Sequence, residues 1–138
     1  MKYIFNVSPN LRQKQSTQKI MLELTIALLI VFGFSLAYYF QAYGMDYVIR
    51  ALVLMACSVL TALVTEVAFA FFMKKGAKFD LKYVGKFLNS SFGWITAIIL
   101  VLMTPISIRP FALIVSTFLC ILFGKLLFGG FGNNIFNP

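Results

Sequence analysis

The sequence has no histidine and few charged residues. Charged side chains make up 12% of the 138 residues, about half of the roughly 25% that is usual in soluble domains. The only two cysteines, Cys57 and Cys120, lie within apolar segments and form no Cys-x-x-Cys motif. These absences argue against a zinc site and a structural disulfide, so we expect no metal and predict that both thiols are buried as small apolar groups.

Apolar residues are correspondingly abundant. They form 61% of the chain, and the mean hydropathy is +0.91, which predicts an integral membrane protein. A net charge of +8 on a soluble surface would suggest a nucleic-acid partner, but here the lysines and arginines lie between long apolar runs. They are typical of topology signals, so we expect no nucleic acid among the partners. The amino-terminal region lacks the form of a signal peptide, because the apolar run starts only near Ile20 after a polar lead.

Four apolar segments predict an all-α, polytopic membrane helix bundle. They cover residues 20–40, about 47–73, 92–104 and 111–128. The first two are long enough to cross a hydrocarbon core of about 30 Å, whereas the third would cover roughly 20 Å. This third segment either starts inside the membrane, is a half-helix, or is a short span lengthened by residues 85–89 in a locally thinned bilayer.

The basic residues predict the domain organisation and the orientation. Residues 1–19 form a basic lead, 20–128 a transmembrane helical domain with a loop at 74–90, and 129–138 a Gly/Asn-rich segment. Within the loop a single acid, Asp80, faces Lys74, Lys75, Lys78, Lys82 and Lys86. The positive-inside rule therefore places the N-terminus and this loop in the cytoplasm, and the turn at Gly44 outside. Lys125, near the end of the fourth span, agrees with that direction.

Two polar features inside the second span are candidates for function. Glu66 lies roughly 10 Å from the end of this span, a depth at which a charge is costly and is usually paired, protonated or directed into a cavity. It is our candidate for an ion or proton path; the alternative is a structural carboxylate that bonds a neighbouring helix or reaches the headgroups. Ser58, Thr61 and Thr65, joined by Ala62, form a stripe that is typical of close helix packing.

The last segment is the least generic part of the chain. Its glycines allow close backbone approach, and its asparagine side chains both donate and accept hydrogen bonds. It is therefore our candidate for a cofactor-proximal loop, made of Gly129, Gly130, Gly132, Asn133 and Asn134. No catalytic residue is assigned.

The same segment carries a family resemblance. Residues 125–138, KLLFGGFGNNIFNP, closely resemble the K-x-L-F-G-G-x-G-x-N-I-F-N-P stretch of the RnfD/NqrB family. Weaker likenesses extend over the whole chain, at Ser8-Pro9 with Arg12, at Ser16-Thr17 before Ile20-Met21, at Thr65-Glu66 before aromatics and Lys74-Lys75, and at Thr96 to Pro105. The family's Asp-Gly-Ser before the third helix is replaced here by Asn89-Ser90-Ser91.

The resemblance implies a membrane subunit with two related helical halves in an inverted repeat, similar to channel-like transporters. Members carry FMN on a threonine through a phosphoester bond, in a Ser/Thr-Gly-Ala-Thr motif downstream of the Asn-Pro that ends this sequence. That tetrapeptide does not occur here, so no covalent FMN threonine is expected in this chain, and riboflavin is a further possible flavin. The chain is then expected to be the amino-terminal half of such a subunit, as a truncated or split version.

The expected function is that of a subunit of an Rnf-type complex. Such a complex couples electron transfer between ferredoxin and NAD to Na⁺ or H⁺ translocation in the cell inner membrane, and the partners would be its other membrane subunits and the lipid bilayer. The charge pattern and the lead favour the Rnf D-type subunit over the B subunit of the Na⁺-translocating NADH:quinone reductase. Two other classes stay open: a non-redox structural remnant that packs against partner subunits, and an independent small transporter.

Overall fold

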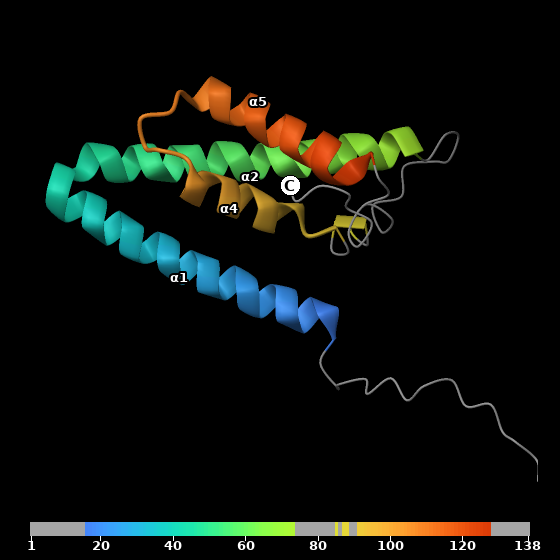
Figure 1. The fold of residues 1–138 in the computed structure, drawn as a ribbon, viewed down its shortest axis with the longest axis horizontal. Helices are drawn as coiled ribbons and strands as arrows, with labels where there is room; N and C mark the ends of the chain where they lie inside the picture. Colours follow the sequence, from blue (N-terminus) through green and yellow to red (C-terminus); the bar gives the residue numbers. More distant parts are fainter. Residues whose placement is uncertain (1–15, 74–84, 86, 89–90, 128–138) are drawn as a thin grey trace, which may run out of the picture.

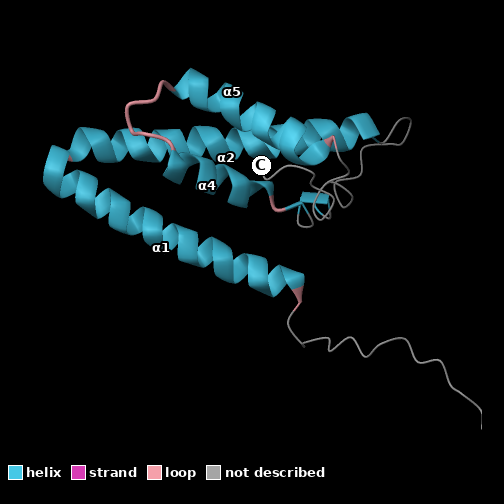
Figure 2. Cartoon of the chain, viewed as in Figure 1, coloured by secondary structure: helices cyan, strands magenta, loops and turns pink. Residues whose placement is uncertain are grey.

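The protein is an all-α membrane helix bundle. The computed structural model describes residues 16–73, 85, 87–88 and 91–127, and within these residues it contains helices but no strand (Figure 2). The elements are α1 (Thr17–Tyr43), α2 (Met45–Met73), α4 (Gly93–Met103), α5 (Pro110–Ile121) and the π-helical segment η1 (Leu122–Leu126) that continues α5. The predicted fold class is therefore confirmed.

The first two helices form a hairpin with a one-residue turn. Ser16 caps α1, because its hydroxyl accepts from the amide of Lys19 at 3.4 Å. Gly44 alone separates α1 from α2 and has a positive φ of 88°, which glycine adopts without steric cost. The turn is thus shorter than the gap between the predicted apolar segments at residues 20–40 and about 47–73, because the helices extend over the other residues of that gap.

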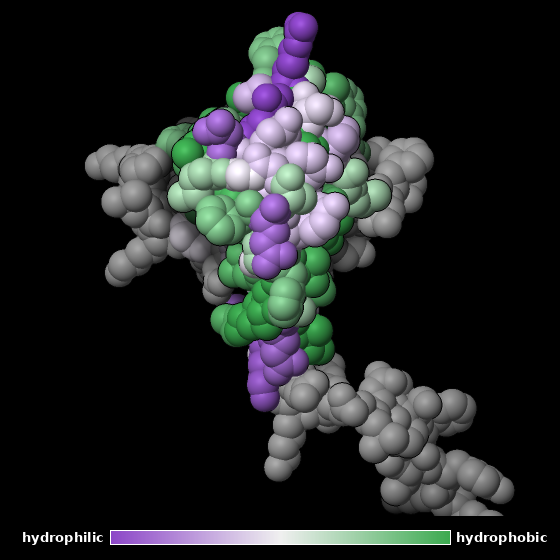
Figure 3. All heavy atoms as spheres, turned by 90° about the vertical axis from the view of Figure 1, so that its left-hand side faces the viewer, coloured by the Kyte–Doolittle hydropathy of each residue, from purple (hydrophilic) through white to green (hydrophobic). Residues whose placement is uncertain are grey.

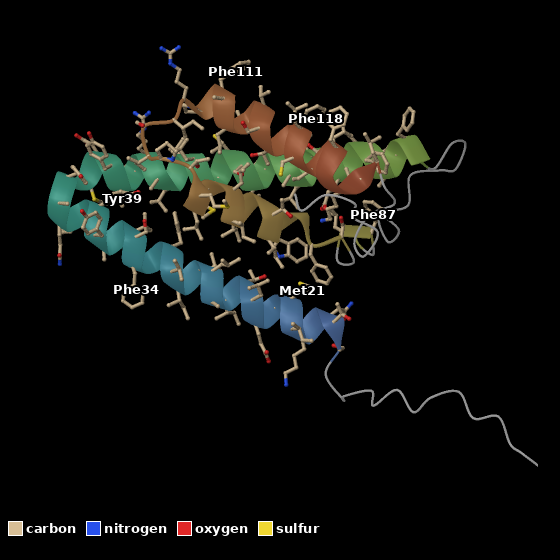
Figure 4. The ribbon with its side chains drawn as sticks, viewed as in Figure 1. Met21, Phe34, Tyr39, Phe87, Phe111 and Phe118 are labelled. Carbon is tan, nitrogen blue, oxygen red and sulfur yellow. The ribbon has the colours of Figure 1, made fainter. Side chains whose placement is uncertain are left out.

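α2 is the central helix of the bundle and packs against all the other elements (Figure 1). α5 and α4 lie along it, while α1 diverges from it with distance from Gly44. Both α1 and α2 are long and apolar enough to cross a membrane. Only 6% of the most apolar 18-residue stretch of α1, and 33% of that of α2, is buried inside the bundle. Side chains such as Phe34, Phe111 and Phe118 point away from the bundle (Figure 4). These apolar side chains would face lipid.

The third helix is short, as the sequence predicted. α4 has 11 residues and would cover about 16 Å, which is half of the hydrocarbon core. It begins after Phe92 and ends at Thr104, whose position before Pro105 disfavours further α-helix. Since residues 89–90 and most of 74–88 lie outside the described residues, the predicted loop at 74–90 stays a prediction. The same holds for the inverted-repeat relationship.

Small and hydroxylated residues bring α2, α4 and α5 close together. Ala62 and Ala97 are completely buried in one apolar cluster. Beside them Ser58 donates to the carbonyl of Ala97 at 3.2 Å and shares a hydrogen bond of 3.0 Å with Thr117. The prediction that the stripe on α2 serves helix packing is confirmed for Ser58 and Ala62. Thr61 bonds the carbonyl of Cys57 on its own helix instead.

Arg50 holds the turn between α4 and α5. Its guanidinium donates to the carbonyls of Ile106, Ser107 and Ile108 at 2.8, 3.1 and 3.2 Å. This end of the molecule also carries four tyrosines in successive ring contacts, Tyr38, Tyr39, Tyr43 and Tyr47. Figure 3 faces this end and shows pale and purple residues over much of it, with green apolar residues around them. Such a mixture is typical of the membrane interface.

The two cysteines differ from their prediction in one respect. Cys57 and Cys120 are both free thiols, but each is half-buried instead of buried. Both lie on helix faces that turn partly away from the packed centre, because the buried positions on α2 and α5 are taken by Ser58, Thr117 and Ile121.

Candidate functional site

A buried ion pair joins α2 to the end of α5. Glu66 is 0% exposed and Lys125 is 2% exposed, and the Nζ of Lys125 lies 3.0 Å from the Oε1 of Glu66. Charges of this kind are expensive in an apolar interior unless they are paired. The pairing explains how both side chains can lie buried between α2 and η1.

The start of α4 completes the site beside α2 and the end of α5. The hydroxyl of Ser91 donates to the same Oε1 of Glu66. Phe92 then takes a left-handed conformation, with φ 55° and ψ 34°, which is strained for a bulky residue and costs about 1–3 kcal/mol. This bend turns the chain into α4 directly beneath the carboxylate. Gly93 follows, and a Cβ at that position would overlap the Glu66 carboxylate.

The carboxylate also faces the positive end of a helix dipole. The first turn of α4 carries amides without a helical partner, and such a terminus favours a negative charge. Trp94, in this same turn, fixes α4 to α1 through a hydrogen bond of 3.4 Å from its Nε1 to Thr25. The position of the α4 terminus against Glu66 is therefore set by contacts with two other helices.

Lys125 reaches Glu66 from a π-helical turn. In η1 the amide of Leu127 donates to the carbonyl of Leu122, five residues back, at 3.0 Å. The widened turn buries Gly124, Lys125 and Leu126. Single π turns are rare and occur frequently at functional sites. The interpretation of Lys125 as a topology signal near the membrane surface is therefore wrong, because the side chain is buried and paired.

One oxygen of Glu66 has no partner among the described residues. Both donors approach Oε1, whereas Oε2 is buried without a hydrogen bond from this part of the chain. An ionised carboxylate offers about four acceptor positions on its two oxygens. The site can therefore accept a further small donor, a proton or a cation, and it can do so at Oε2.

Two of the cavities that described residues line differ in size and chemistry. One, between α1, α2 and α4, has a volume of about 40 Å³, which suits a water molecule or two. The other is a groove of about 430 Å³ between α2 and α5, lined by Leu60, Thr61, Val64, Thr65, Ala68, Ile114, Val115 and Phe118. It has a suitable size for a ligand, but its lining holds no cation for a phosphate, and its threonines bond their own helix.

The candidate residues therefore have different outcomes. Glu66 lies at a built polar site, with the paired environment that its depth predicted. Sequence reasoning missed Ser91, Gly93 and Lys125 as its neighbours. The Gly/Asn-rich segment, Gly129 to Asn134, lies outside the described residues, so its role near a cofactor stays a prediction.

Known proteins resemble the chain over almost its full length. The profile of the NQR2, RnfD, RnfE family matches residues 4–138. The chain is also similar to a protein of Actinobacillus succinogenes that is named as the D subunit of an ion-translocating oxidoreductase complex, with 29% identity over 131 residues. That alignment covers 95% of this chain and 33% of the relative, so the chain spans about a third of the relative's length. No solved structure matches the chain.

Proposed function

Because the chain belongs to the NQR2, RnfD, RnfE family, as its terminal motif predicted, we propose that it works as a membrane subunit of an ion-translocating oxidoreductase complex of the Rnf type. In such a complex, electron transfer between ferredoxin and NAD drives Na⁺ or H⁺ across the membrane. The name of the Actinobacillus relative, a D-type subunit, favours the Rnf type over the B subunit of the NADH:quinone reductase.

The observation that carries this proposal, beyond the family, is the buried carboxylate of Glu66. An ion-translocating subunit needs a group within the membrane that can hold a small cation, and an intramembrane carboxylate is the usual group. Glu66 has an open oxygen and lies against a helix that is too short to cross the membrane. We assign Glu66 to the ion path on this basis.

The partners and the cofactor follow from the proposed complex. The exposed apolar faces of α1 and α5 are suited to lipid and to other membrane subunits. FMN, or riboflavin, belongs to the proposal as a cofactor of the full-length subunit. When bound, a flavin would supply one- and two-electron transfer. The Gly/Asn-rich segment, Gly129 to Asn134, is the part of this chain that we assign to its surroundings.

The test uses the subunit at full length in its complex. Inverted membrane vesicles are supplied with reduced ferredoxin and NAD⁺, and both NADH formation and ²²Na⁺ uptake are measured, with a strain lacking the subunit as the control. Uptake that requires the subunit and persists with a protonophore supports Na⁺ transport. Uptake abolished by the protonophore, together with acidification of the vesicle interior, supports H⁺. Electron transfer and cation uptake that are unaffected by loss of the subunit would overturn the proposal.

A structural remnant is the second candidate, because Ser58, Ala62 and Ala97 pack α2 closely against its neighbouring helices. Deleting residues 129–138 in the full-length subunit separates the two functions. Loss of electron transfer with retained assembly, and loss of flavin fluorescence of the subunit in a denaturing gel, fit the redox subunit. Unchanged electron transfer after the deletion favours the remnant.

A further inference from the structure

Glu66 has one negative charge, and Lys125 already balances it. The ammonium and the hydroxyl of Ser91 both bind Oε1, while Oε2 accepts from none of the described residues. Among these residues, Lys125 is the one cation paired with Glu66. A second cation on Oε2 would leave a net positive charge in a desolvated interior, which is costly. A cation at Glu66 and the contact with Lys125 are therefore mutually exclusive.

Lys125 can leave Glu66 without a change in the helix. Its ammonium is carried on a flexible four-carbon stem, so rotation of the side chain is enough to break the 3.0 Å contact with Oε1 of Glu66. The backbone does not need to turn, because Lys125 follows the buried residues Leu113, Thr117 and Ile121 at intervals of four and lies on the same helix face. Gly124, which immediately precedes Lys125, adds no side chain to obstruct the movement.

The other groups around Glu66 stay in place when Lys125 leaves. Ser91 still donates to the carboxylate, and the α4 terminus still provides partial positive charge. Gly93 keeps the carboxylate in direct contact with that terminus. These groups would thus partly stabilise the negative charge of Glu66 until another cation binds.

We propose that Lys125 is a tethered counter-cation that exchanges at Glu66 with a small monovalent cation, a proton or Na⁺. Lys125 then acts as a positioning residue: it blocks the site in the resting protein and opens it when its side chain swings away from Oε1. The inference rests on the proposed function, because such exchange has a use only within an ion-translocating complex. It adds to that function the residue that controls whether a cation occupies Glu66.

The test measures when Glu66 becomes protonated. Dicyclohexylcarbodiimide adds to protonated carboxyl groups in apolar surroundings, and mass spectrometry locates the adduct. The full-length subunit in its complex, reconstituted in proteoliposomes, is labelled at rest and during electron transfer. We expect little adduct on Glu66 at rest and at least a several-fold increase during turnover. If Na⁺ is the exchanging cation, NaCl suppresses this labelling and choline chloride does not; equal labelling in both salts identifies a proton.

Two variants calibrate the labelling. Lys125→Met removes the counter-cation at similar length, and its Glu66 should be labelled already at rest. Lys19→Met removes a lysine from an exposed pair with Glu23 and should leave the labelling of Glu66 unchanged. If Lys125→Met fails to assemble, wild-type complex at acid pH provides the same check that the reagent reaches the site.

The outcomes separate this inference from the proposed function. A complex that moves cations, yet shows no Glu66 adduct during turnover although the calibration sample is labelled, has a permanent ion pair, and the inference is then wrong while the function stands. Absence of the adduct in Lys125→Met at rest would mean that removing the counter-cation does not free Glu66 for protonation, which also overturns the inference. A complex that transfers electrons without moving cations overturns both.

Discussion

The backbone of Gly93 lies directly against the carboxylate of Glu66, so that no side chain larger than hydrogen fits between α4 and α2 at this point. We expect Gly93→Ala to destabilise the protein by about 1–3 kcal/mol, the usual cost of overpacking, and to weaken the ion pair by displacing Glu66. Thermal unfolding in detergent measures the change. Gly33, in exposed α1 with free space around it, is the matched control. Gly33→Ala should be neutral or stabilising, by up to about 1 kcal/mol.

The ion pair between Glu66 and Lys125 predicts strong non-additivity. Either Glu66→Gln or Lys125→Met leaves one buried partner without its counterpart, at a cost of about 3–5 kcal/mol for an uncompensated charge. The double variant removes both charges and should cost less than the sum of the two single variants. Chemical denaturation of all four proteins in micelles measures the coupling. Additive losses would mean that the two side chains do not interact in the folded protein.

The buried hydroxyl of Ser58 predicts a smaller effect. Ser58→Ala removes its bonds to Ala97 and Thr117, and hydrogen bonds between membrane helices contribute about 0.6 kcal/mol on average and at most about 1.7. We expect a loss within that range by thermal unfolding. Ser116→Ala, at an exposed position of α5, should leave the melting temperature unchanged. An equal loss in both variants would contradict a specific role for Ser58.

We expect the hydrogen bonds of the Arg50 guanidinium to protect the turn between α4 and α5 from amide hydrogen exchange. Arg50→Lys keeps the charge but cannot reproduce three hydrogen bonds from a planar fork. Amide hydrogen exchange over residues 104–109 should therefore become faster, with little change in α1. Arg109→Lys, at an exposed neighbouring position, is the control and should not alter this exchange. Unchanged amide exchange in Arg50→Lys would show that the turn keeps its shape without the three hydrogen bonds from Arg50.

Much of the fold was predictable because the lengths of the apolar segments can be read from a single sequence. The short third helix followed from the distance between Ser91 and Pro105, and the hairpin followed from Gly44 between two apolar runs. The depth of Glu66 predicted that its charge would be paired, protonated or directed into a cavity, and the structure shows it paired. These features depend on the sequence of one segment at a time, and helix length converts directly into depth in a bilayer.

The partners of Glu66 could not be predicted in the same way. A lysine near the end of a span usually extends its charge to the interface, whereas Lys125 lies on the buried face of α5 and η1, four residues after Ile121. Ser91 belongs to a polar run that indicated a helix boundary, and the left-handed Phe92 that aims it at Glu66 leaves no signature in residue type. Contacts between separate helices depend on rotation about each axis, and a single sequence specifies this rotation weakly.

The one-residue turn at Gly44 has a consequence for how the protein enters the bilayer. α1, with 27 residues, and α2, with 29, lie on either side of a single non-helical residue. Such a turn offers no slack in which one helix could be held in water while the other settles in lipid. The two helices must therefore insert as one hairpin, with their outer ends remaining on the same face of the membrane.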